Sequence, residues 1–109
     1  MIHVLATIEV KPGTRAEFLN VFNQNVPNVL AEDGCHAYVP AVDTVPGFGD
    51  LTPRENVVVV IEEWESVAHL EAHLAAPHMA TFREAAKDML VGVDLQVLKS
   101  SSPRSLLEN

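Results

Sequence analysis

The sequence is poor in cysteine, in basic residues and in long apolar runs, and each shortage argues against a class of protein. The single cysteine, Cys35, cannot form a disulfide within the chain, and no CxxC pair offers a zinc or redox motif. Seven basic residues stand against fifteen acidic ones, and the net charge of -8 would repel nucleic acid phosphates and anionic membrane surfaces. No apolar segment approaches the ~20 residues of a membrane span. We therefore expect no nucleic-acid partner and no membrane insertion.

Motifs for nucleotide binding and for serine hydrolysis are also missing. The chain has no GxGxxG segment, no P-loop pattern and no GxSxG elbow, so these functions lack support. The N-terminus has no basic stretch before an apolar run, which a secretory leader would have. Together with the lone cysteine, this favours a soluble protein in a reducing cytoplasm.

The chain does have enough apolar residues for one hydrophobic core. With 109 residues, 48% of them hydrophobic, it should bury about two-thirds of the surface that its extended form exposes. We expect a single domain over residues 1–99, followed by a polar C-terminal tail over residues 100–109.

Hydrophobic periodicity predicts the order strand, helix, strand, strand, helix pair, strand. The predicted strands are residues 2–10, 35–43, 57–61 and 91–97, and the predicted helices are 14–30 and a pair that begins after Ser66 and at Pro77. Thr14 and Glu17 match a capping box at the start of the first helix, and Pro27 predicts a kink near its end. The unbroken apolar run 57–61 indicates a central strand covered on both faces.

This order is that of the split βαβ unit, so we expect an α+β, ferredoxin-like fold with an antiparallel sheet. The helices of such a fold cover only one face of the sheet. Leu5 and part of the run 57–61 would lie on the other face, and this patch is too apolar to leave in water at about 25 cal/mol per Å². Two sheets packed face to face would bury it, so we expect a homodimer.

Residues 44–56 form an unusually long connection between the two middle strands. They contain two prolines and two glycines, whereas hairpin loops usually have about 2 to 5 residues. Because long ordered loops often cover sites, this segment is a candidate for such a cover.

Histidine is concentrated in one part of the chain. Three of the five histidines fall within residues 69–78, close to Trp64. His69 and His73 are four residues apart and therefore share one face of the predicted helix, at the border of its apolar stripe. An imidazole there can face a cavity between helix and sheet, where an apolar lining keeps it neutral and able to accept a proton.

Two other interpretations of these histidines remain open. They can be ordinary half-exposed histidines on a helix surface. Alternatively, the pair His69 and His73 could hold zinc with Glu65 or Glu71, although the segment departs from HExxH because its glutamate is one position late. We favour the interpretation without a metal.

The aromatic residues Trp64, Tyr38 and Phe82 can line a pocket, or they can belong to the core or a dimer contact. Cys35 has no basic cluster to lower its pKa, so we interpret it as a structural thiol in a strand.

Three segments together resemble the antibiotic-biosynthesis monooxygenase superfamily: Ile61–Ser66 (IEEWES), Ala68–Leu74 (AHLEAHL) and Pro77–Met79 (PHM). Further residues resemble its bacterial quinol monooxygenase branch: Val26-Pro27, Val29-Leu30, Glu32, Gly34-Cys35-His36, Tyr38 and Val42-Asp43. The similarity extends over residues 2–98. It implies a dimeric ferredoxin-like α+β barrel, and oxidation by molecular oxygen without flavin, haem or metal.

The same resemblance implies which residues form the site. His73 and His78 match the recurrent histidines of the family's pocket, and Trp64 matches its recurrent tryptophan. We take His73 as the leading catalytic base and His78 as the second candidate. The candidate substrate contacts are Tyr38, Trp64, His69 and Phe82. Haem degradation is not expected, because the haem-degrading relatives carry tryptophan in place of His73 and histidine in place of Arg83.

We therefore expect a cofactor-independent monooxygenase that converts an electron-rich, menadiol-like quinol to its quinone with O2. This chemistry needs a base, because a deprotonated quinol reduces O2 more readily, and an apolar pocket that keeps reactive intermediates away from water. Two alternatives stay open: an isomerase or epimerase that acts on a small oxidised metabolite, and a non-catalytic dimeric protein that binds a quinone as a sensor or stress protein.

Overall fold

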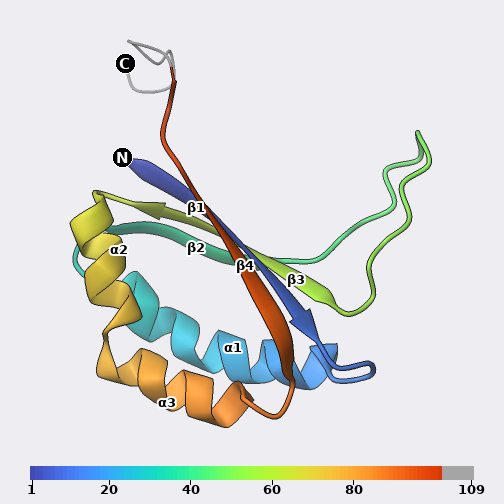
Figure 1. Ribbon diagram of the computed structural model, residues 1–109, viewed down its shortest axis with the longest axis horizontal. Coiled ribbons are helices and arrows are strands. Elements are labelled where there is room, and N and C mark those ends of the chain that lie inside the picture. The colour runs from blue at the N-terminus through green and yellow to red at the C-terminus, as the bar shows by residue number, and fades with distance from the viewer. Residues whose placement is uncertain (102–109) are drawn as a thin grey trace.

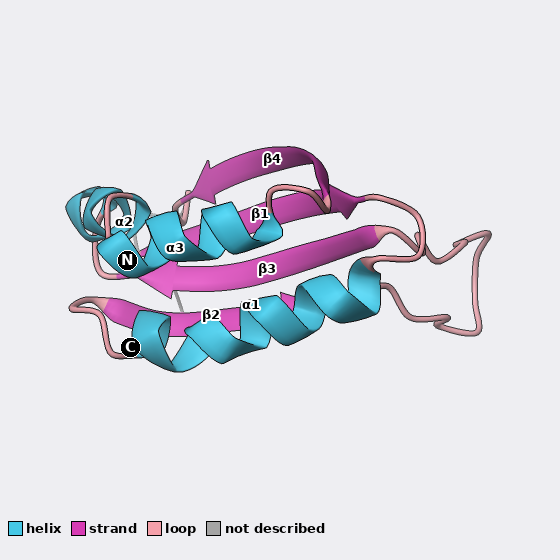
Figure 2. Ribbon diagram, turned by 90° about the horizontal axis from the view of Figure 1, so that it is seen from below, coloured by secondary structure: helices cyan, strands magenta, loops and turns pink. Residues whose placement is uncertain are grey.

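The computed structural model describes residues 1–101 and contains a four-stranded antiparallel sheet with its helices on one face (Figures 1 and 2). The elements are β1 (Ile2–Val10), α1 (Arg15–Leu30), β2 (Cys35–Ala41), β3 (Val57–Trp64), α2 (Val67–Leu74), α3 (Pro77–Ala86) and β4 (Leu90–Leu98). The strand order β2-β3-β1-β4 confirms the predicted ferredoxin-like fold. Of the predicted C-terminal tail, residues 102–109 lie outside the described part of the chain.

One face of the sheet carries the core, because side chains alternate between the two faces along β1 and β3. Its buried strand residues are Ile2, Val4, Ala6, Ile8 and Val10 on β1, and Val58, Val60, Glu62 and Trp64 on β3. Helix side chains pack onto them: Phe18, Phe22 and Val29 from α1, Leu70 from α2 and Met79 from α3. A single carboxylate, Glu62, therefore stands among the apolar residues of this face.

The opposite face of the sheet, which we call the open face, is uncovered by the described residues and carries an apolar row next to polar residues such as Thr7 and Asp94. Leu5, Val39 and Ile61 lie side by side on it, because Ile61 pairs with both Leu5 and Val39. Val39 is 50% exposed and Ile61 is 45% exposed. Within the described residues of one chain, the helices cover residues 57–61 only on the core face (Figure 1). The expected cover of the other face by a second copy stays a prediction.

The longest helix, α1, differs from its prediction at its start. The capping box was wrong: Thr14 makes no side-chain cap bond, and its hydroxyl instead donates to the Lys11 carbonyl at 2.6 Å in the preceding turn. Pro27 is accommodated within a helix that continues to Leu30. In residues 1–101, no helix is long and apolar enough to cross a membrane.

Candidate active site

A cavity of about 180 Å³ lies between the core face of the sheet and the helices. Its walls are mainly apolar and aromatic, with Phe18, Phe22 and Phe82 among them, which suits a ligand with a ring system. The polar and charged side chains that reach it are Tyr38, Glu62, His73 and Arg83. Of the predicted site residues, Tyr38, His73 and Phe82 line this cavity, whereas Trp64, His69 and His78 do not.

His73 is a buried imidazole on α2, with 2% of its side chain exposed. Its ring centroid lies 4.7 Å from that of Trp64 and 5.4 Å from that of Tyr38, so aromatic neighbours fix its orientation. Its Nδ1 lies 2.8 Å from Glu32 Oε2. An ionised carboxylate can only accept a hydrogen bond, so this contact assigns the proton to Nδ1. The other nitrogen, Nε2, has no protein partner within residues 1–101 and is left free to accept a proton.

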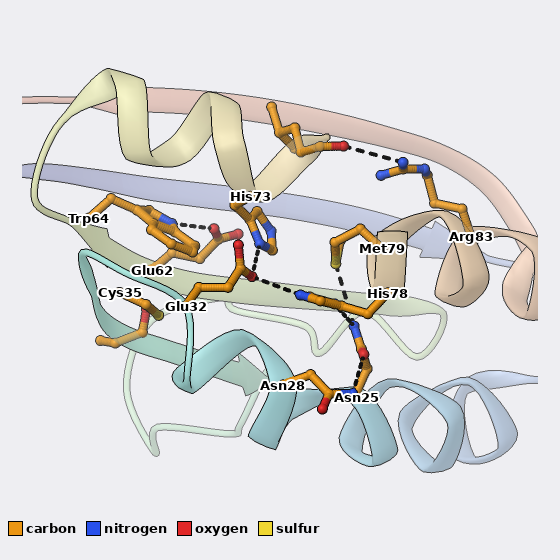
Figure 3. A network of polar contacts seen from close by, with 12 residues as sticks. Asn25, Asn28, Glu32, Cys35, Glu62, Trp64, His73, His78, Met79 and Arg83 are labelled. Carbon is orange, nitrogen blue, oxygen red and sulfur yellow. Dashed lines mark hydrogen bonds and ion pairs between the residues drawn. The ribbon is translucent and has the colours of Figure 1, made fainter. Parts of the chain in front are cut away.

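Glu32 is shared by two histidines, as Figure 3 shows. Its Oε2 lies 3.2 Å from His78 Nε2, close enough for an ion pair but without hydrogen-bond alignment. Asn25 Nδ2 lies 3.2 Å from His78 Nδ1 and donates to it, so Nε2 carries the proton in the neutral ring. Asn28 in turn donates to Asn25 Oδ1 at 3.1 Å. Asn28, Asn25 and His78 are thus linked by hydrogen bonds, and His78 places its Nε2 beside the carboxylate that bonds to His73.

The turn that follows α1 brings Glu32 under α2. Gly34 in this turn has φ +78°, and a Cβ there would lie 2.4 Å from His69 Cδ2. Only glycine fits both the backbone angle and the space. The His69 ring is part of the same support, with Nδ1 2.7 Å from Ser66 Oγ and Nε2 3.4 Å from Asp33. His69 therefore lies against the turn rather than in the cavity.

Glu62 is the residue that sequence reasoning missed. Only 5% of it is exposed, it lines the cavity, and its Oε1 accepts a hydrogen bond from Trp64 Nε1 at 2.9 Å. The pKa of Glu62 is raised to about 7: burial raises it most, the Trp64 hydrogen bond lowers it, and the nearby Glu32 carboxylate adds to the increase. The signal was present in the sequence, since Val58, Val60, Glu62 and Trp64 alternate onto one face of the strand.

A stability measurement can check the state of Glu62. The pKa of this carboxyl is raised in the folded protein from 4.5 to about 7. Its protonation therefore stabilises the fold at low pH, and this stabilisation is lost as the pH rises through 7. Relative to Glu62→Gln, the wild-type free energy of unfolding should fall by about 2–3 kcal/mol between pH 5 and pH 8. Urea denaturation of both proteins measures this difference, and equal pH dependence in the two would contradict the assignment.

Tyr38 and Cys35 stay protonated in this setting. Burial raises the pKa of the Tyr38 phenol, and the carboxylates of Glu62 and Glu32 raise it further. The Tyr38 ring stacks on Phe22 with centroids 5.3 Å apart. Burial followed by the same two carboxylates also raises the pKa of the Cys35 thiol. Tyr38 can therefore offer a hydroxyl donor at the cavity wall.

Trp64 and His78 do not line the cavity. Trp64 is fully buried and contacts the His73 ring and Glu62. His78 lines a separate hollow of about 240 Å³ between α1 and α3. For the zinc alternative, no group of three or more histidine, cysteine or carboxylate side chains within residues 1–101 is arranged to hold a metal ion.

The sequence and the fold can be compared with those of known proteins. A family model described as antibiotic biosynthesis monooxygenase matches residues 1–85. The chain belongs to this family. It is 42% identical over 101 residues to the protein named "Probable quinol monooxygenase YgiN" of Escherichia coli (strain K12), an alignment that covers 91% of this chain and 97% of that protein.

Solved structures of other proteins have the same fold as this chain. The structure of PA3566 from Pseudomonas aeruginosa matches with a TM-score of 0.77 and 24% identity, covering 93% of this chain and 94% of that one. The structure of Rv0793 from Mycobacterium tuberculosis matches with a TM-score of 0.74 and 23% identity, covering 95% and 98%. Family membership and the relative from Escherichia coli support monooxygenase activity for this chain.

Proposed function

We propose that this family member oxidises an electron-rich, menadiol-like quinol to the quinone with O2, without flavin, haem or metal, and that His73 is the base. The name of the Escherichia coli relative supports a quinol as substrate. The observation that carries the proposal is the state of His73: Glu32 holds its Nδ1, and its free Nε2 belongs to a ring that lines an apolar cavity.

The proposed reaction starts with proton transfer to His73. Nε2 accepts the proton of one quinol hydroxyl, and the imidazolium that forms is stabilised by the Glu32 carboxylate 2.8 Å from Nδ1. The resulting quinolate gives up two electrons to O2, and its second hydroxyl gives up its proton. When oxygen is only reduced, the products are quinone and hydrogen peroxide, so that two protons and two electrons pass from quinol to O2.

Glu62 is the second group in the cavity that can carry a proton. Its pKa of about 7 means that the carboxyl exchanges a proton near neutral pH. It lines the same cavity as His73, so it can accept the second quinol proton or deliver one to reduced oxygen. In this scheme His78 acts through Glu32 as a positioning residue, and Tyr38 and Phe82 contact the ring of the substrate.

Oxygen uptake with reduced menadione tests the proposed function. The protein should be stripped of metal and flavin, and its rate compared with spontaneous autoxidation and with the His73→Ala variant. A rate above both controls supports the proposal, and the ratio of peroxide formed to O2 consumed separates reduction, near one, from insertion, near zero. Tight menadione binding without added O2 uptake would contradict catalysis and favour the non-catalytic alternative.

We also infer that two copies stack their open faces to form a homodimer. The open face carries Val39 and Ile61 half-exposed in one row with Leu5. The polar pair His3 and Glu63, with 3.2 Å between His3 Nδ1 and Glu63 Oε1, lies at one end of this face. An apolar centre with a polar edge is typical of an interface between sheets.

Ile61→Glu should convert the dimer into a monomer at micromolar concentration. In a twofold dimer each copy contributes one new carboxylate to the interface, so the substitution places two charges there. Burying each unpaired charge costs several kcal/mol of dimer stability. Sedimentation velocity measures the outcome. Val67→Glu is the matched control, because Val67 is 50% exposed on α2, away from the open face, and this variant should stay dimeric. A wild-type protein that is monomeric at this concentration would contradict the stacking.

A further inference from the structure

The connection between β2 and β3, which we call the arm (residues 42–56), projects from the sheet on the side opposite the helices (Figure 1). Its base is clamped by Asp43 and Arg54, with Arg54 Nε 2.8 Å from Oδ2 and Nη2 2.9 Å from Oδ1. Arg15 Nη1 also donates to the Arg54 carbonyl at 3.0 Å. A bidentate pair of this kind fixes geometry, so the arm leaves the sheet in a set direction.

The arm presents apolar side chains that its own chain does not cover. Val45 is 71% exposed, Phe48 is 74% exposed and Leu51 is 62% exposed. No residue of the arm lines the cavity of the same chain, so the expected cover of a site is not found within one copy. Several exposed large apolar residues on one ordered projection indicate a contact surface.

The rim of the cavity is the matching uncovered surface. Val93 and Leu95 of β4 and Leu74 of α2 line the cavity and are 58%, 45% and 43% exposed. Arg83 lies at the same rim, where its Nη2 donates only to the Leu74 carbonyl at 3.2 Å; it has no acidic partner within residues 1–101. Asp50 near the tip of the arm likewise has no ion pair in the described part of the chain. The two surfaces therefore match in apolar character and in charge.

We propose that the arm of one copy closes the cavity rim of a second copy, with Phe48 packed against Leu74, Val93 and Leu95 and with Asp50 facing Arg83. This inference rests on the proposed stacking of open faces and deepens the proposed activity. The arm rises on the open-face side (Figure 1), and stacked sheets lie about 10 Å apart. The arm therefore passes the partner's sheet and reaches toward the partner's helices, whereas its own cavity lies behind its own sheet. Twofold symmetry makes the closure reciprocal.

A closed rim would matter for the chemistry. The cavity is otherwise bordered by half-exposed apolar residues on β4, so water has access to it in a single copy. Covering that rim with an apolar arm keeps the quinolate and reduced oxygen away from bulk water. Each site would then be complete only in the dimer.

Thiol cross-linking tests the contact directly. In a Cys35→Ser background, Phe48→Cys with Val93→Cys should give a covalent dimer with a short bis-maleimide reagent, read on a denaturing gel. The control pair is Phe48→Cys with Gln24→Cys, because Gln24 lies in the hollow between α1 and α3; it should give at most a trace of dimer. Cross-linking within one chain, or equal dimer in both pairs, overturns the proposal.

Kinetics with reduced menadione gives the second readout. Phe48→Ser should raise KM by roughly fivefold or more and leave the protein dimeric, whereas Phe48→Leu should stay within about twofold of wild type. If the proposed activity is wrong, the wild-type protein shows no turnover of reduced menadione. The cross-linking result then still decides whether the arm contacts a second copy. An active wild type with no cross-link between copies overturns the arm and leaves the proposed function standing.

Discussion

Replacing His73 with alanine should lower kcat for menadiol oxidation by roughly 10² to 10⁴, the range that a general base contributes. The reason is geometric: His73 has its Nδ1 held by Glu32 and its Nε2 free, and its ring lines the cavity. Removing the ring leaves the Glu62 carboxyl, whose pKa is about 7, as the remaining proton acceptor in the cavity. Steady-state oxygen uptake, corrected for autoxidation, measures the change.

The control for this variant is His36→Ala. His36 is exposed and pairs with Glu65 at 2.6 Å on the surface, so kcat should stay within about twofold of wild type. Circular dichroism and the dimer mass establish that both variants are folded. A correctly folded His73→Ala protein that loses less than about threefold in kcat would remove His73 from the role of base.

Replacing Glu32 with glutamine should lower kcat by a similar factor, roughly 10² to 10⁴, because it changes the tautomer of His73 rather than removing the ring. The carboxylate can only accept from Nδ1 at 2.8 Å, whereas an amide can donate to it. A donated bond places the ring proton on Nε2, which then cannot accept one from the quinol. KM should change little, since Glu32 does not line the cavity.

Asp33→Asn is the matched control for this prediction. Asp33 is the next residue, its side chain is 98% exposed, and it contacts His69 rather than His73. The control should keep wild-type kcat within about twofold. If Glu32→Gln loses activity only through a higher KM, with kcat unchanged, Glu32 holds the substrate or the fold and does not set the state of His73.

The fold could be predicted from the sequence because its elements are strongly periodic. Alternation along Ile2–Val10 and helical spacing in α2 and α3 are local signals, and their order leaves few topologies. The cap at the start of α1 was predicted wrongly, because the Thr14 hydroxyl bonds to the Lys11 carbonyl of the preceding turn and makes no cap bond to the helix.

The candidate site was only partly predictable, for a physical reason. The position of His73 follows from the helix face, but Glu32 lies 41 residues earlier in the chain and meets it only through tertiary packing. His69 and His73 share a helix face, but they have different partners. His69 packs against the turn at Gly34 and contacts Asp33, whereas His73 bonds to Glu32 and lines the cavity. Glu62 was readable from strand alternation, but its burial depends on what the helices cover.

The state of His73 with a ligand present is the most direct test of the central claim. Long-range ¹H–¹⁵N NMR spectra of protein labelled in its histidine rings report which nitrogen carries the proton, and titration with menadione reports which nitrogen meets the ligand. We predict that His73 is neutral with its proton on Nδ1, and that its Nε2 signal shifts on binding more than any other histidine nitrogen. A proton on Nε2, or a His73 ring that menadione leaves unmoved while it binds, would contradict the account.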